Sequence, residues 1–279
     1  MVMNAKVKAY LYLLFTLIAF SSIEVSSKPL MGTVDPFFMT AFRFLVGGLV
    51  LMFFVDKQIE TKDLLPLTLI GALNGILSMT SLQLSVAHSN ASTAATLVAS
   101  NPIFVSLFAL LILKEKHTIR RYIGIALGFV GLIVFSLGMI SGDSWLGIFY
   151  GVVAAVTFGL YTVLMGKYMK KYTPVSVTAY STLISSLIYI AILALSGHFY
   201  VPSIGISEWG ILIYLGVVVT GLAYLTYFKV IELIGTAQSS RVFFLKPIVA
   251  TLFAVILLGE SLSVAKIVGM LIVLFSLFL

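Results

Sequence analysis

Three charged residues interrupt long apolar stretches, and their side chains are the strongest candidates for chemistry in this sequence. Lys246 lies in RVFFLKPIVATLF, Glu24 in AFSSIEVSS and Arg43 in MTAFRFLVG. Lys246 would sit about 12 Å into its apolar segment at 1.5 Å per helical residue. A cation that faces lipid at that depth costs at least ~2.5–3.5 kcal/mol. We therefore expect Lys246 to face water, a carboxylate or an anionic substrate group. The depths of Glu24 and Arg43 allow these two to pair, as a structural ion pair or in a functional role.

Two prolines mark the same position in two similar stretches. Residues 101–115 read NPIFVSLFALLILKE and residues 246–260 read KPIVATLFAVILLGE, with seven of fifteen positions identical at a constant offset. Because proline has no N–H, Pro102 and Pro247 deprive the carbonyls of Val98 and Phe243 of their helical partners. Such carbonyls need partners inside a membrane, from neighbouring helices or from a wet cavity. A packed proline kink is the alternative, and the symmetric pair of prolines favours the cavity.

The repeated stretch predicts two halves, residues 1–140 and 141–279. A weaker echo aligns Phe20 with Phe158 and Pro36 with Pro174. The segment KEKHTIRR after the first copy holds four basic residues, whereas GESLSVAK after the second holds one. Five membrane spans per half would invert the second half relative to the first, and the opposite charge bias is what an inverted repeat predicts.

The elements that must position these residues are membrane-spanning helices. The chain is 61% hydrophobic and 10% charged with a mean hydropathy of +1.15, far more apolar than a soluble domain. The apolar segments are continuous and about 20 residues long, which favours helices over barrel strands. We predict ten spans, at residues 8–27, 36–55, 64–86, 91–113, 119–139, 145–165, 175–195, 208–228, 237–258 and 262–279. The absence of cysteine excludes disulfides and thiolate chemistry.

The net charge of +7 is explained by membrane orientation better than by nucleic-acid binding. If the N-terminus is cytoplasmic, the inner loops carry twelve Lys and Arg residues and the outer loops carry only Lys28 and Lys266. Because basic residues accumulate on the cytoplasmic side, both termini are predicted to be cytoplasmic, in a multi-pass protein of the plasma membrane.

The order of proline, apolar helix, Glu and a returning helix with Gly124 or Gly269 resembles the EamA-type branch of the drug/metabolite transporter superfamily. The stretch MTAFRFLVGGLVL, with Arg43 in the second span, also resembles that family. The resemblance implies a central cavity between the halves, peripheral fifth and tenth helices, and export of small metabolites, amino acids or amphiphilic compounds. Carried over onto this sequence, it places the following residues at the cavity: Phe20, Ser22, Asn74, Asn101, Phe158, Tyr161, Tyr224 and Lys246.

The sequence thus predicts a secondary transporter that moves, and exports, a small metabolite by alternating access. Glu24 is the candidate for proton coupling, and an uncoupled facilitator is the alternative. Buried Asn and Tyr side chains either bind the substrate or join helices. An intramembrane enzyme is disfavoured because the sequence has neither H-E-x-x-H nor G-x-S-x-G, and a scaffold needs no buried lysine. We expect no cofactor, metal or nucleic-acid partner, and a monomer or homodimer in the lipid bilayer.

Overall fold

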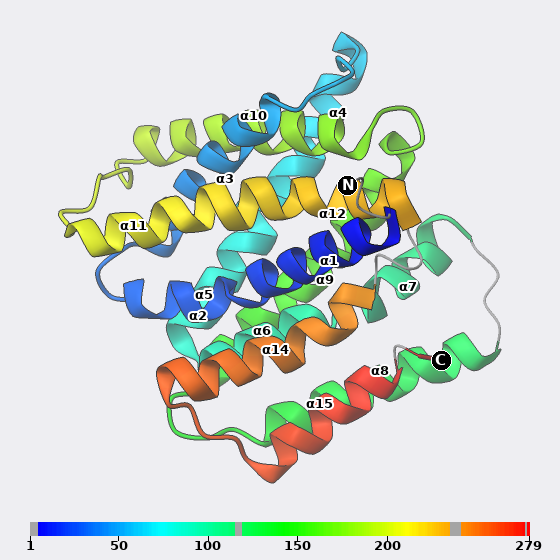
Figure 1. Cartoon of the computed structure of the whole chain (residues 1–279). Coiled ribbons are helices and arrows are strands. Elements are labelled where there is room, and N and C mark those ends of the chain that lie inside the picture. The colour runs from blue at the N-terminus through cyan, green and yellow to red at the C-terminus, as the bar shows by residue number, and fades with distance from the viewer. Residues whose placement is uncertain (1–4, 115–118, 235–240, 277) are drawn as a thin grey trace.

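The computed structural model describes residues 5–114, 119–234, 241–276 and 278–279, and these form helices and connecting turns without a strand. In chain order the elements are α1 (Ala5–Ser21), α2 (Ile23–Ser27), η1 (Lys28–Leu30), α3 (Pro36–Met52), α4 (Thr61–Ala72), η2 (Leu73–Met79), α5 (Thr80–His88), α6 (Ala91–Ala99), α7 (Asn101–Ile112), α8 (Ile119–Leu137), α9 (Trp145–Tyr168), α10 (Pro174–Leu195), α11 (Ile206–Tyr214), η3 (Leu215–Leu222), α12 (Ala223–Ile234), α14 (Arg241–Leu258) and α15 (Val264–Ser276). Figure 1 shows that α1 begins and α15 ends at the same end of the bundle, which we call the terminal end. The opposite end is the far end.

The apolar helices coincide with the predicted spans. Over the described residues, six segments are long and apolar enough to cross a membrane: Val7–Leu30, Thr61–His88, Ala91–Ile112, Trp145–Tyr168, Pro174–Leu195 and Ile206–Val230. Four further apolar helices are shorter: Pro36–Met52, Tyr122–Leu137, Leu245–Leu258 and Val264–Ser276. Each of the ten overlaps one predicted span, so the structure confirms an all-helical membrane fold.

Helices α3 and α10, which correspond to the second predicted span of each half, begin in the same way. The Asp35 carboxylate accepts hydrogen bonds from the N–H groups of Phe37 and Phe38, and the Thr173 hydroxyl accepts one from that of Ser176. Each capping residue is followed by a proline in the first helical turn. Both features satisfy or remove N–H groups that a helix start leaves without partners. The Pro36–Pro174 echo in the sequence therefore corresponds to two equivalent helix starts.

The third span of each half contains a π-helical segment. The hydroxyl of Thr80, directly after η2, donates to the Gly75 carbonyl of η2 at 3.3 Å, and in η3 the Thr220 hydroxyl donates to the Leu215 carbonyl at 2.8 Å. In both cases the acceptor lies five residues earlier, where a wider turn places it. Segments of this kind occur frequently at functional sites.

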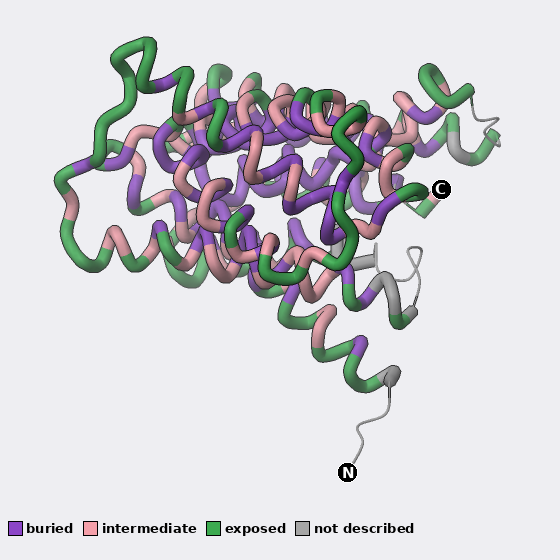
Figure 2. The backbone as a smooth tube through the Cα atoms, turned by 90° about the horizontal axis from the view of Figure 1, so that it is seen from above, coloured by how far each residue is buried: buried purple, intermediate pink, exposed green. Residues whose placement is uncertain are grey.

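Helices of the two halves interleave rather than forming separate domains. α1 packs on α12 and α14, α3 packs on α10 and η3, and α6 packs on α14. A methyl group on Gly48 of α3 would lie 2.9 Å from the Leu183 backbone of α10, so glycine permits this close packing. α8 and α15 pack mainly on each other and lie side by side at one edge of the bundle (Figure 1). Figure 2 shows buried residues following the bundle interior and exposed residues following its outer surface.

Candidate functional site

Lys246 is paired with a carboxylate inside the bundle. Its Nζ lies 2.9 Å from Oε1 of Glu24, and the two residues are 7% and 0% exposed. Glu24 lies in the first turn of α2, directly after the interruption between α1 and α2 at Ser22. Lys246 lies in α14, where its carbonyl also accepts a 3.3 Å hydrogen bond from the Ser21 hydroxyl. Of the three environments predicted for Lys246, the structure provides the carboxylate, and the pair joins the two halves.

Arg43 does not pair with Glu24, contrary to the expectation from their depths. Its Nε donates to the Thr220 hydroxyl at 2.7 Å, and its guanidinium carbon lies 5.6 Å from the centre of the Phe44 ring. Nη2 lies 4.0 Å from the sulfur of Met79. The reason is rotational: Arg43 is on the side of α3 that packs against η3, whereas Glu24 is directed towards α14.

The predicted aromatic residues gather in two groups. The Phe20 and Tyr224 rings meet edge to face at 5.1 Å, and the Phe158 and Tyr161 rings lie 5.7 Å apart. Phe158 packs both against the cluster that contains Phe20 and Tyr224 and against the one that contains Tyr161. The Ser22 and Tyr214 hydroxyls share a 2.7 Å hydrogen bond, which joins the interruption between α1 and α2 to α11. The structure thus brings the Phe20 and Tyr224 rings into contact, and Phe158 packs against the same apolar cluster.

Asn101 and Pro102 lie at a real interruption in the fourth span, but the freed carbonyl has a local partner. α6 ends at Ala99, and α7 begins at Asn101. The Asn101 amide donates to the Val98 carbonyl at 2.9 Å. The expectation that this carbonyl needs a neighbouring helix or a wet cavity is therefore wrong. α14, by contrast, continues through Pro247 without interruption.

Asn74 is buried in η2, beside a contact that joins η2 to α9. Its exposed fraction is 4%, and within the described part of the chain its Oδ1 has no hydrogen-bond partner. The nearby Ser78 hydroxyl donates to the Ala154 carbonyl of α9 at 3.0 Å. Asn74 is therefore positioned by the π-helical segment, but the structure does not bring it into contact with Glu24, Arg43 or Lys246.

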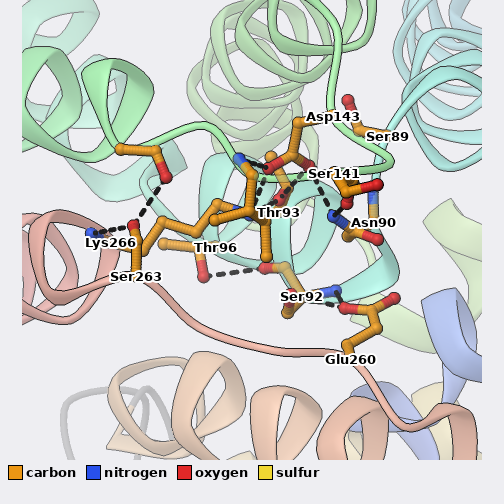
Figure 3. Close-up of polar contacts among 12 residues, drawn as sticks. Ser89, Asn90, Ser92, Thr93, Thr96, Ser141, Asp143, Glu260, Ser263 and Lys266 are labelled. Atoms are coloured by element: carbon orange, nitrogen blue, oxygen red, sulfur yellow. Dashed lines mark hydrogen bonds and ion pairs between the residues drawn. The ribbon is translucent and has the colours of Figure 1, made fainter.

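Sequence reasoning missed a polar network at the far end, which links α6 to two connections (Figure 3). Glu260, directly after α14, accepts hydrogen bonds from the N–H groups of Ala91 and Ser92 at 2.6 and 3.0 Å and from the Ser92 hydroxyl at 2.6 Å. The carboxylate thus satisfies the N-terminal N–H groups of α6 and opposes the positive end of its dipole. The positive φ of Gly259, 66°, turns the chain out of α14 towards this contact.

Asp143, in the α8–α9 connection, forms the second part of this network. It accepts hydrogen bonds from the backbone and side-chain N–H groups of Asn90, both at 3.1 Å, and from the Thr93 hydroxyl at 2.7 Å, and it pairs with Lys266. Burial disfavours the charged carboxylate, but the hydrogen bonds from Lys266 and Thr93 outweigh it and lower the pKa of Asp143. We call Glu260, Asp143, Lys266 and their α6 partners the far-end network. The signal for this network in the sequence was the position of Asp143 and Glu260, each just before the start of a predicted span.

The central charges are closed to solvent in this conformation. Arg43 is 2% exposed, and the Glu24–Lys246 pair is similarly buried. Among the described residues, no group of three His, Asp or Glu side chains is arranged to hold a metal ion.

Comparison with known proteins agrees with this geometry. The EamA-like transporter family matches the chain twice, over residues 7–137 and 145–279. An uncharacterized transporter of Clostridium kluyveri is 31% identical over 277 residues, covering 94% of this chain and 89% of that protein. An S-adenosylmethionine uptake transporter of Rickettsia felis is 28% identical over 193 residues, covering 67% of this chain and 65% of that protein.

A solved crystal structure matches the fold with a TM-score of 0.67 at 20% identity, covering 96% of this chain and 94% of that one. The names of the relatives point to a transporter rather than an enzyme. The chain is a multi-pass protein of the plasma membrane, and it belongs to the EamA-like transporter family of the drug/metabolite transporter superfamily.

Proposed function

We propose that this transporter works by alternating access and exports a small metabolite, such as an amino acid or an amphiphilic compound. The observation that carries the proposal is the buried Glu24–Lys246 ion pair between the two halves. Burying an ion pair costs several kcal/mol per ion in desolvation. Removing one partner leaves a buried charge without compensation and destabilises a protein by about 3–5 kcal/mol. Ionisable residues inside membrane helices are expensive and usually mark substrate or ion pathways.

The proposed architecture has ten spans in two inverted five-helix repeats, residues 1–140 and 141–279, with both termini in the cytoplasm. Two family matches with nearly these boundaries support it. The two π-helical segments support it as well, and so do the helix starts of α3 and α10, each of which has a capping side chain followed by proline. The repeated stretches also end alike, because Lys114 and Gly259, at the same offset of 145 residues as the two prolines, have φ angles of 53° and 66°.

In this architecture the far end faces outward and the far-end network is its closed gate. Glu260 joins the end of α14 to the start of α6, and these helices belong to different halves. Its counterpart in the first repeat, Glu115, lies outside the described residues. Alternating access would break the Glu260 contacts when the outer side opens.

The name of one relative bears on the proposals for the substrate and for the direction of transport. S-adenosylmethionine, named for the Rickettsia relative, carries an amino-acid group, which agrees with an amino-acid-like solute here. That relative is named for uptake, so uptake is the second candidate for direction. Glu24 is the candidate for proton coupling, and an uncoupled facilitator is the alternative mechanism.

Flux into proteoliposomes tests the proposal. Purified full-length protein would be assayed with labelled amino acids, purines, sugars and quaternary amines, with and without a proton gradient. We expect one class to cross and Lys246→Ala to abolish its flux. If no solute crosses faster than in empty liposomes, the proposed function fails. If Glu24→Gln leaves gradient-driven flux unchanged, the coupling role is lost and the facilitator remains.

The topology can be tested separately because the chain contains no cysteine. Lys114→Cys and Ser261→Cys place single thiols at exposed positions beside the ends of the two repeated stretches. We expect a membrane-impermeant maleimide to label Ser261→Cys from outside the cell and Lys114→Cys only after the membrane is opened. Labelling of both from one side would refute the inverted repeat.

A further inference from the structure

The three central charges do not balance. Glu24 and Lys246 neutralise each other across 2.9 Å, whereas Arg43 has no carboxylate within ion-pair distance among the described residues. The buried group therefore carries one excess positive charge. An uncompensated charge in a low-dielectric interior is unfavourable unless an anion joins it.

The guanidinium of Arg43 also retains hydrogen-bonding capacity. Nε is used by Thr220, and Nη2 faces only the thioether of Met79. Nη1 is buried and has no hydrogen-bond partner among the residues that the structure describes. Adjacent guanidinium N–H groups form the planar fork that binds a carboxylate through two parallel hydrogen bonds.

The contacts that the Arg43 guanidinium makes among the described residues are with neutral groups. η3 contributes Thr220, α3 itself contributes the Phe44 ring, and η2 contributes Met79. The ionisable groups that act on Arg43 electrostatically include Tyr224 and Glu24. Tyr224 lies four residues after Thr220, about one helical turn further on, and its ring meets that of Phe20 edge to face at 5.1 Å. An aromatic pair therefore follows the contact of Arg43 along the same helix.

We propose that Arg43 binds the carboxylate of the transported solute, and that the substrate is therefore a carboxylate-bearing small molecule with an apolar part. The Phe20–Tyr224 pair receives the apolar part. Lys246 is a weaker anchor because a solute carboxylate would have to displace Glu24 from it, whereas Arg43 needs no displacement. This inference rests on the proposed function and names its substrate class.

The test compares acids with their amides. Purified full-length protein would be titrated with a series of amino acids and with the corresponding amino-acid amides, following thermal stabilisation and proteoliposome flux. We expect at least one acid to bind and its amide, which has the same skeleton without the carboxylate, to bind at least tenfold more weakly. This comparison needs no variant and so does not depend on whether a mutant folds.

Variants then test whether Arg43 is the residue that binds the solute carboxylate. Arg43→Gln should weaken binding of the acid at least tenfold and leave binding of the amide unchanged, and Arg43→Lys should retain part of the acid preference. Arg120→Gln is the matched control, because Arg120 is exposed at the start of α8, where its Nη2 donates to the Phe278 carbonyl at 3.3 Å. It should behave as wild type.

The outcomes separate the two proposals. If amides or cations cross as well as acids in the wild-type protein, transport stands and the carboxylate inference is overturned. Acid preference that persists in folded Arg43→Gln overturns the assignment to Arg43. If neither acids nor any other solute cross, the proposed function fails and the inference fails with it.

Discussion

The two copies of the repeated stretch have different structures. Around Asn101 and Pro102 the fourth span breaks into α6 and α7, and the Asn101 amide returns to the Val98 carbonyl of its own span. Around Lys246 and Pro247 the ninth span continues as α14, and the Lys246 amine reaches Glu24 in α2. The side chain before the proline thus makes a contact within its own span in the first copy and a contact between the two halves in the second. A short amide reaches one turn back, whereas a long amine reaches another helix.

The largest expected effect is at the contact between halves. Lys246→Ala leaves Glu24 buried without its cation, which should destabilise the protein by about 3–5 kcal/mol and abolish flux. The double variant Glu24→Gln, Lys246→Met removes both charges and should recover most of the stability without recovering flux. Melting temperature and proteoliposome flux measure the two effects. A single variant as stable as wild type would show that the pair does not hold the halves together.

A cation placed at the first copy sharpens the contrast. Asn101→Lys makes the first copy resemble the second, but among the described residues no carboxylate is paired with Asn101 as Glu24 is paired with Lys246. We expect destabilisation of at least ~2.5–3.5 kcal/mol, the cost of a lysine without a partner in the membrane. Thermal unfolding in detergent checks this, with Asn101→Gln as the neutral control. A fully stable lysine variant would mean that water or a carboxylate reaches this position.

Removing the local hydrogen bond should have a smaller effect. Asn101→Ala leaves the Val98 carbonyl with only its backbone contact from Ser100 and should cost about 1 kcal/mol. Flux should remain within a few-fold of wild type, because the bond lies within one span. Loss of flux as complete as that of Lys246→Ala would contradict the local role and place Asn101 in the substrate site.

The smallest expected effect is at the ends of the two copies. Lys114 has the left-handed φ of 53° at the position where the second copy has Gly259. A side chain in this region costs roughly 1–2 kcal/mol, offset in part by the greater flexibility of an unfolded glycine. Lys114→Gly should therefore raise stability slightly, and Gly259→Ala should lower it by about 1 kcal/mol. The free energies of unfolding of both variants would show whether the left-handed backbone conformation costs the same at positions 114 and 259.

Much of the fold could be predicted from hydropathy and from the repeat. Ten apolar segments overlap ten helices because the thickness of the bilayer limits the length of an apolar span. The equivalence of Pro36 and Pro174 was visible as a sequence echo and appears as two capped helix starts. The π-helical segments were not predicted, because the wider turn depends on hydroxyl and packing contacts rather than on composition.

The site was predicted only in part. Buried charge at Glu24, Arg43 and Lys246 was expected, but the partners were not, since Arg43 contacts Thr220 and Glu24 contacts Lys246. The far-end network was missed because Asp143 and Glu260 lie in connections, where charged residues are ordinarily exposed to solvent.

The sequence by itself determined that this is a helical membrane protein, where its spans lie, and that three costly charges and two paired prolines lie within them. Only the tertiary structure decided which charge meets which. Hydropathy reports how deep a residue lies along a helix. It does not report which way the residue points around the helix axis, and that rotation is set by packing against helices distant in the sequence.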